Sequence, residues 1–155
     1  MSNDVYGFVA TSNPAKTQAC LSAAAAKRGI GLTFVTEKEL FNFPAEFLPT
    51  GSYVAFALGD RPGKTSADYL TDMIDYAPGA LDDLHASGVA RLNVLIDWID
   101  EIAGDQSTEL LCIAVAECSE IESHAHVKRT ELRELMLRDF RSYAPPNKLY
   151  LILGR

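Results

Sequence analysis

The segment Thr11-Ser12-Asn13-Pro14-Ala15-Lys16 has the residue types and the position of an anion-binding loop. It follows an apolar run that predicts a strand, and its proline indicates that a helix begins directly afterwards. Backbone N–H groups at a helix N-terminus attract anions, and hydroxyl, amide and ammonium groups add further donors. In an enzyme we would expect Thr11, Ser12, Asn13 and Lys16 to bind phosphate. The same residues also suit a plain capped helix start.

The longer segment VATSNPAKTQA resembles the opening of the house-cleaning triphosphatases that act on inosine and xanthosine triphosphates. In that family a similar Thr-x-Asn-Pro-x-Lys segment binds the triphosphate. The resemblance implies that Thr11, Asn13 and Lys16 contact phosphate and that a divalent metal ion assists. It covers eleven residues, and no later segment matches the family, its acidic metal-binding segments included.

Two further segments carry incomplete chemical patterns. Gly59–Ser66 approximates a Walker A loop, but three residues separate its glycines where the pattern needs four, so a tight turn is expected. His124 and His126 lie two residues apart near carboxylates and Cys118, which are ligand types that transition metals accept. Cys118 and His124 could also form a nucleophile and base. A polar loop is the simpler interpretation of this run, and we predict neither a metal site nor a cofactor.

The distribution of charge is the most distinctive pattern of the chain. The net charge is −7, yet residues 65–127 carry thirteen acids and a single basic residue, Arg91. The residues before this block have a net charge of +1 and those after it +4. The acids fall away from the apolar stripes of two predicted helices, which places them on a surface. We predict that this surface binds a basic partner, with an apolar anchor at its centre, through Asp68, Asp72, Asp75, Val94, Asp97, Trp98, Asp100 and Glu101.

Strand and helix patterns alternate along the chain. Strands are expected at Val5–Ala10, Leu32–Val35, Tyr53–Leu58, Leu110–Ala116 and Leu149–Leu153, and helices at about 13–28, 66–77, 80–85, 89–103 and 127–143, with a short one after Thr36. The order β-α-β-(α)-β-α-α-β-α-β predicts a single α/β domain over residues 1–155, a sandwich with a mixed or mostly parallel sheet of about five strands. Ligands of open α/β sheets bind beyond the carboxyl ends of strands, so the loops after residues 10, 58 and 116 are candidate sites.

Composition excludes several classes of protein. The acidic block argues against nucleic acid as a partner, and no apolar run approaches the ~20 residues that span a bilayer. Three cysteines without paired spacing, and no leader-like N-terminus, favour a cytoplasmic protein. We therefore predict a small acidic protein-binding module such as an immunity protein, an antitoxin or an enzyme inhibitor. Metal-assisted purine triphosphate hydrolysis at the Thr11–Lys16 loop is the alternative.

Overall fold

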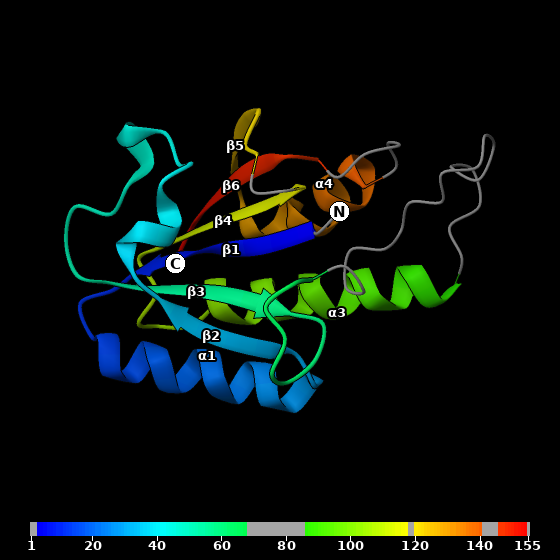
Figure 1. Ribbon diagram of the computed structural model, residues 1–155, viewed down its shortest axis with the longest axis horizontal. Helices are drawn as coiled ribbons and strands as arrows, with labels where there is room; N and C mark the ends of the chain where they lie inside the picture. The colour runs from blue at the N-terminus through cyan, green and yellow to red at the C-terminus, as the bar shows by residue number, and fades with distance from the viewer. Residues whose placement is uncertain (1–2, 68–85, 118–119, 141–145, 155) are drawn as a thin grey trace.

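In the part of the chain that the structure describes, six strands form one sheet in the order β2-β3-β1-β4-β6-β5, and helices cover one of its faces (Figure 1). The computed structural model describes residues 3–67, 86–117, 120–140 and 146–154. The strands are β1 (Asn3–Ala10), β2 (Gly31–Val35), β3 (Tyr53–Gly59), β4 (Leu110–Glu117), β5 (Ser123–Val127) and β6 (Lys148–Leu153). The helices are α1 (Pro14–Arg28), α3 (Ala86–Ala103) and α4 (Leu132–Asp139), with 3-10 turns η1 (Glu37–Leu40), η2 (Ala45–Phe47) and η3 (Arg129–Glu131).

The sheet is mixed, which confirms one of the two expected forms, but it is mostly antiparallel, so the other expected form, a mostly parallel sheet, is wrong. Every neighbouring pair is antiparallel except β5 with β6, which the helix α4 connects. The β1-α1-β2 unit does cross over as the alternation predicts, but β3 inserts between its two strands and pairs with both. The alternation of strands and helices predicts the β1-α1-β2 crossover, but it does not predict where a later strand such as β3 enters the sheet.

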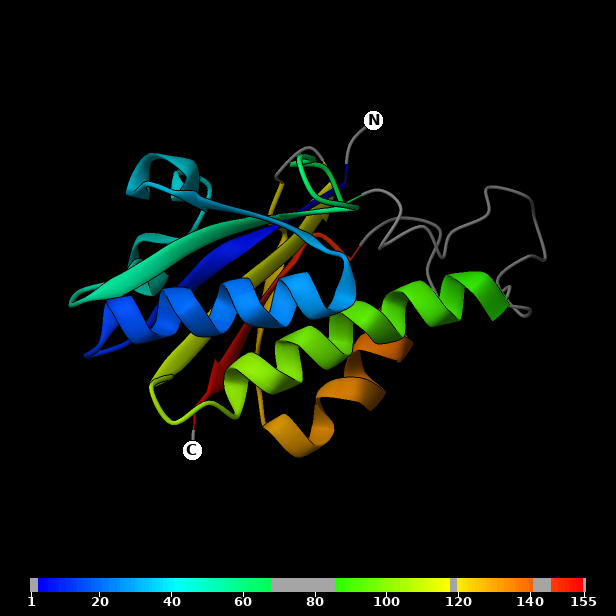
Figure 2. The same cartoon turned by 90° about the horizontal axis from the view of Figure 1, so that it is seen from below.

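The helix layer lies on one face of the sheet, with α3 between α1 and α4 (Figure 2). Helix α1 begins where the sequence predicts: the Asn13 side chain accepts from the Lys16 N–H, and a proline occupies the first turn. It ends at Gly29, whose left-handed φ of 69° closes the last turn. Helix α3 buries the leucines and isoleucines of its predicted stripe, which include Leu92, Leu95 and Ile99. These side chains and the sheet form the larger of two cores.

The connection between β2 and β3, residues 36–52, lies on the opposite face of the sheet, which we call the open face because no described α-helix covers it. The predicted capping box at its start is confirmed, because the Thr36 backbone and hydroxyl both donate to the Glu39 carboxylate. Leu40 and Phe43 of this connection pack on Tyr6 and form the second core. The part of the open face beyond this cover is what shapes the candidate site.

The remaining differences from the expected elements lie at the C-terminal end. A sixth strand, β5, occupies a segment that was expected to be a polar loop. The last helix is shorter than 127–143, because Val127 ends β5 and α4 begins only at Leu132. The helices expected at about 66–77 and 80–85 lie outside the described residues, apart from Ser66, Ala67 and the turn that precedes them. No helix in the described part of the chain is both long and apolar enough to cross a membrane.

Candidate functional site

The acidic surface of α3 is matched by basic side chains from its two neighbours. Asp97 pairs with Arg133 of α4, and Asp100 accepts from the Arg129 guanidinium with Nε to Oδ1 at 2.8 Å. Glu101 pairs with Lys27 and Arg28 of α1, each at 3.2 Å. Hydrogen bonds from Arg28, and then from Lys27, lower the pKa of Glu101. The block that is acidic in sequence is thus partly neutralised in space by the basic residues that flank it in sequence.

Trp98 lies in the core, which corrects its expected place on the acidic surface. Its side chain is fully buried, and its ring stands edge-on to Phe56 of β3 with centroids 5.2 Å apart. Val94 is half-buried and packs against the same core. A partner cannot use Trp98 as an anchor without unfolding α3 from the sheet. Asp68, Asp72 and Asp75, which were expected on the same surface, lie outside the described residues.

The polar atoms of the Thr11–Lys16 loop bind one another. The buried Thr11 hydroxyl accepts from the Asn13 N–H at 3.1 Å and from the Thr17 hydroxyl at 2.9 Å. Asn13 Oδ1 accepts from the Lys16 N–H at 3.3 Å, and its carbonyl accepts from the Thr17 N–H at 3.1 Å. With the Thr11 N–H, which donates to the Ser52 carbonyl, four amides of the loop and first turn are already bonded, while Ser12 and Lys16 remain exposed. The loop has the bonding of a helix cap.

The three loops named from the sequence do not meet at one edge of the sheet. Ala10 ends β1 opposite Tyr53, which begins β3, and opposite Leu110, which begins β4. Because both neighbours run antiparallel to β1, the loops after residues 58 and 116 lie at the far end of the sheet. The carboxyl-end rule holds for parallel strands, and it fails here for that reason.

The Walker A-like segment Gly59–Ser66 and the His124–His126 pair both have local structural roles. The turn after β3 closes on itself, since the Asp60 N–H donates to the Ser66 carbonyl at 2.8 Å. His124 and His126 both lie on the open face of β5, with ring centroids 6.0 Å apart, and Phe47 packs on both rings. Among the described residues, no group of three or more His, Cys, Asp or Glu side chains is placed to hold a metal ion. Cys118 lies outside the described residues.

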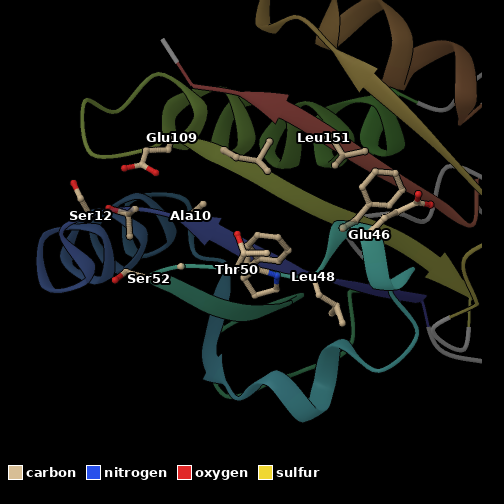
Figure 3. Close-up of a pocket in the computed structure, with 14 residues that line it drawn as sticks. Ala10, Ser12, Glu46, Leu48, Thr50, Ser52, Glu109 and Leu151 are labelled. Atoms are coloured by element: carbon tan, nitrogen blue, oxygen red, sulfur yellow. The ribbon is translucent and has the colours of Figure 1, made fainter.

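A groove of about 450 Å³ opens on the open face, at the sheet end where β1 finishes and β4 starts (Figure 3). Its floor consists of Phe8, Ala10, Leu110 and Leu151. These residues come from three adjacent strands and point to the same face, because Ala10 pairs with Leu110 while Phe8 and Leu151 both pair with Cys112. The groove is therefore built by register between segments far apart in the chain.

Residues 46–52 form the wall of the groove, and the sequence keeps them irregular. Pro44 and Pro49 have no backbone N–H to donate, so this part of the chain does not form a regular α-helix or a strand ladder. The Thr11 N–H donates to the Ser52 carbonyl at 3.1 Å, which ties this wall to the end of β1. Of the floor residues, Ala10 and Leu110 keep part of their surface exposed beside this wall, while Phe8 and Leu151 are almost fully buried.

Two carboxylates mark the ends of the groove. Figure 3 shows Glu109 and Ser12 at one end and Glu46 at the other. The backbone of Glu109 is fixed, because its N–H donates to the Ala10 carbonyl at 2.9 Å and its carbonyl accepts from the Gly154 N–H at 3.0 Å. Among the described residues that line the groove, Glu46 and Glu109 are the charged ones, and no lysine or arginine is present. The groove thus combines an apolar floor with negative ends.

Sequence reasoning missed every residue of this groove except Thr11 and Ser12. One signal was available: Leu110–Ala116 is apolar at every position, which predicts a strand covered on both faces. The expected helices can all pack on one face, so the second face needed another cover.

The chain matches no protein-family model, and neither a curated protein nor a solved structure is significantly similar to it.

Proposed function

We propose that this protein is an acidic binding module for a basic protein partner, as immunity proteins, antitoxins and enzyme inhibitors are. We further propose that the groove between β4 and residues 46–52 is its recognition site. The observation that carries the proposal is the pairing of an apolar floor with carboxylates at both ends and no basic side chain along the described lining. Apolar contact supplies affinity, and the surrounding negative charge speeds the encounter with a cationic protein.

The groove is a better site than the surface of α3 for one electrostatic reason. Carboxylates on α3 already have partners at salt-bridge distance, so a basic protein must first replace those intramolecular pairs. Both Glu46 and Glu109 are exposed, and no ion pair of either is found among the described residues. A cation that reaches the groove gains attraction without breaking a native contact.

Charge reversal with a matched control tests the proposal. The groove variant Glu46→Lys/Glu109→Lys is compared with Glu37→Lys/Glu120→Lys, which makes the same change in net charge at exposed positions away from the groove. Affinity capture from the native lysate is followed by titration of the captured protein. We expect the wild type and the control to retain one basic protein and the groove variant to lose it, with association that slows as salt rises.

Three outcomes would contradict the proposal. The groove variant could retain the partner unchanged, or Asp97→Asn/Asp100→Asn could abolish capture while the groove variant does not. The protein could also hydrolyse purine triphosphates with Mg²⁺, which is the alternative that the Thr11–Lys16 loop predicts. That alternative has less support, because two amides of the loop bond to the Thr11 and Asn13 side chains within the cap, and among the described residues no group of three or more His, Cys, Asp or Glu side chains is placed to hold a metal ion.

A further inference from the structure

We infer that the groove binds an extended segment of the partner in which two basic side chains flank an apolar one. This inference rests on the proposed function and deepens it by naming what the site recognises. The apolar side chain lies on the floor of Phe8, Ala10, Leu110 and Leu151, and the basic ones reach the ends of the groove, at Glu109 and at Glu46.

The shape of the floor favours a side chain at its centre. Phe8 and Leu151 are almost fully buried, while Ala10 and Leu110 between them and the rim are half-buried. Because the side chain of Ala10 is only a methyl group, space remains above it in the groove that a longer side chain at this position would fill. An apolar side chain placed there removes its own surface and that of Leu110 from water.

The ends of the groove differ from its floor in the chemistry they offer. Figure 3 shows Glu109 and Ser12 at one end and Glu46, a residue of η2, at the other. Lysine and arginine are long side chains with apolar stems and cationic heads, so each can follow an apolar rim to a carboxylate. Since negative charge stands at both ends, a segment with basic residues on both sides of its apolar residue matches the groove best.

An extended segment is the form of partner that fits the place. Residues 46–52 and the start of β4 confine the groove from two sides, and a volume of about 450 Å³ holds a few side chains and no helix. A strand-like segment directs alternate side chains to the same face, so a basic-x-apolar-x-basic pattern presents all three toward the groove.

Short peptides test the inference directly on the full chain. The peptide Ac-Lys-Gly-Leu-Gly-Lys-NH₂ is titrated into the labelled protein and followed by amide chemical shifts. We expect shifts concentrated at Ala10, Gly51, Glu109 and Leu110. Replacing the peptide leucine with serine should weaken binding about ten-fold through lost apolar burial, and replacing both lysines with glutamate should abolish it.

Variants of the protein separate the two contributions. Glu46→Gln and Glu109→Gln keep shape and remove charge, and each should weaken the peptide about three-fold, because exposed ion pairs contribute little individually. Ala10→Leu fills the floor without changing charge and should weaken the peptide at least ten-fold. If Ala10→Leu does not fold, the two isosteric variants still decide the question.

Several results would overturn the inference. The peptide could bind the Glu→Gln variants as tightly as the wild type, or its shifts could fall on α3. Spermidine could displace the peptide at equal concentration, which would make the groove a site for free polyamines. If the peptide does not bind but the groove variant loses the lysate partner, the proposed segment is wrong and the proposed function stands. If the peptide binds but no basic protein is captured, the groove chemistry is right and the proposed function is wrong.

Discussion

Truncating Trp98 should strongly destabilise this protein, because the only tryptophan of the chain is a core residue. Its indole is fully buried between α3 and β3 and meets Phe56 edge-on. Removing a buried Trp side chain to Ala typically costs about 3–5 kcal/mol, which includes the cavity and the lost aromatic contact. The Trp98 Nε1 atom has no hydrogen-bond acceptor among the described residues, and an unpaired buried donor costs about 1–3 kcal/mol. Truncation removes that cost too, so we expect Trp98→Ala to lose about 3 kcal/mol.

Trp98→Phe is the matched variant for this prediction. It keeps most of the ring packing and removes the unpaired N–H, so we expect a change within about 1 kcal/mol. For a chain of this length each kcal/mol shifts Tm by about 2–4 °C, which gives about 6–12 °C for the alanine variant and less than about 4 °C for phenylalanine. The assay is urea unfolding followed by circular dichroism at 25 °C, with the slope m compared between variants.

Two results would refute this reasoning. A loss below about 1 kcal/mol in Trp98→Ala would show that the indole is not a packed core group. A loss in Trp98→Phe as large as in the alanine variant would show that the N–H has an acceptor. The emission of wild-type Trp98 gives an independent check, since it should be shielded from acrylamide and unchanged when a peptide occupies the groove on the other face.

Two other perturbations follow from local geometry. Gly7→Ala should lose about 3 kcal/mol or more of unfolding free energy, since the added Cβ would stand 1.9 Å from the Cys112 carbonyl oxygen in the central ladder. Gly51→Ala is the control and should be neutral, because nothing lies within 4 Å of its added Cβ. Urea titration measures both variants, and equal stabilities would contradict the prediction. Ser107→Ala tests pH dependence, because the Ser107 hydroxyl and amide donate to Asp105 at 2.5 and 2.8 Å and lower its pKa. The stability from a lowered folded-state pKa is present above the ordinary value of 3.8 and is lost as pH falls through the folded value. We therefore expect the gap in unfolding free energy between wild type and Ser107→Ala to be largest near pH 7 and to narrow below about pH 3.8, and a gap that does not change with pH would contradict the assignment.

Local patterns predicted the elements well wherever one feature fixes an end. Asn13, the following proline and Gly29 bound α1 as expected, and the Thr36 capping box forms. The apolar period of α3 placed its buried face correctly. These features act within a few residues, so the sequence contains all the information that they need.

Patterns that depend on partners far along the chain were not predicted. β5 is a polar edge strand, and its sequence SHAHV gains its ladder hydrogen bonds from β6, a strand that comes later in the chain. The position of β3 between β1 and β2 depends on how residues 36–52 fold back across the sheet, which no local period encodes. The apolar period places Trp98 on the flank of its helix. That flank is buried as well, because α3 packs against the sheet and against both α1 and α4.

The sequence by itself determined an α/β domain, a capped helix after the first strand, and a strongly acidic central block. Only the tertiary structure decided which of the acids are left without a basic neighbour and so suit the partner that we propose. Asp97, Asp100 and Glu101 pair with three arginines and one lysine from α1, η3 and α4, whereas Glu46 and Glu109 remain exposed at the ends of an apolar groove. Charge along a chain is fixed by composition, but a charge becomes available or neutralised through neighbours that only folding brings within a few ångströms.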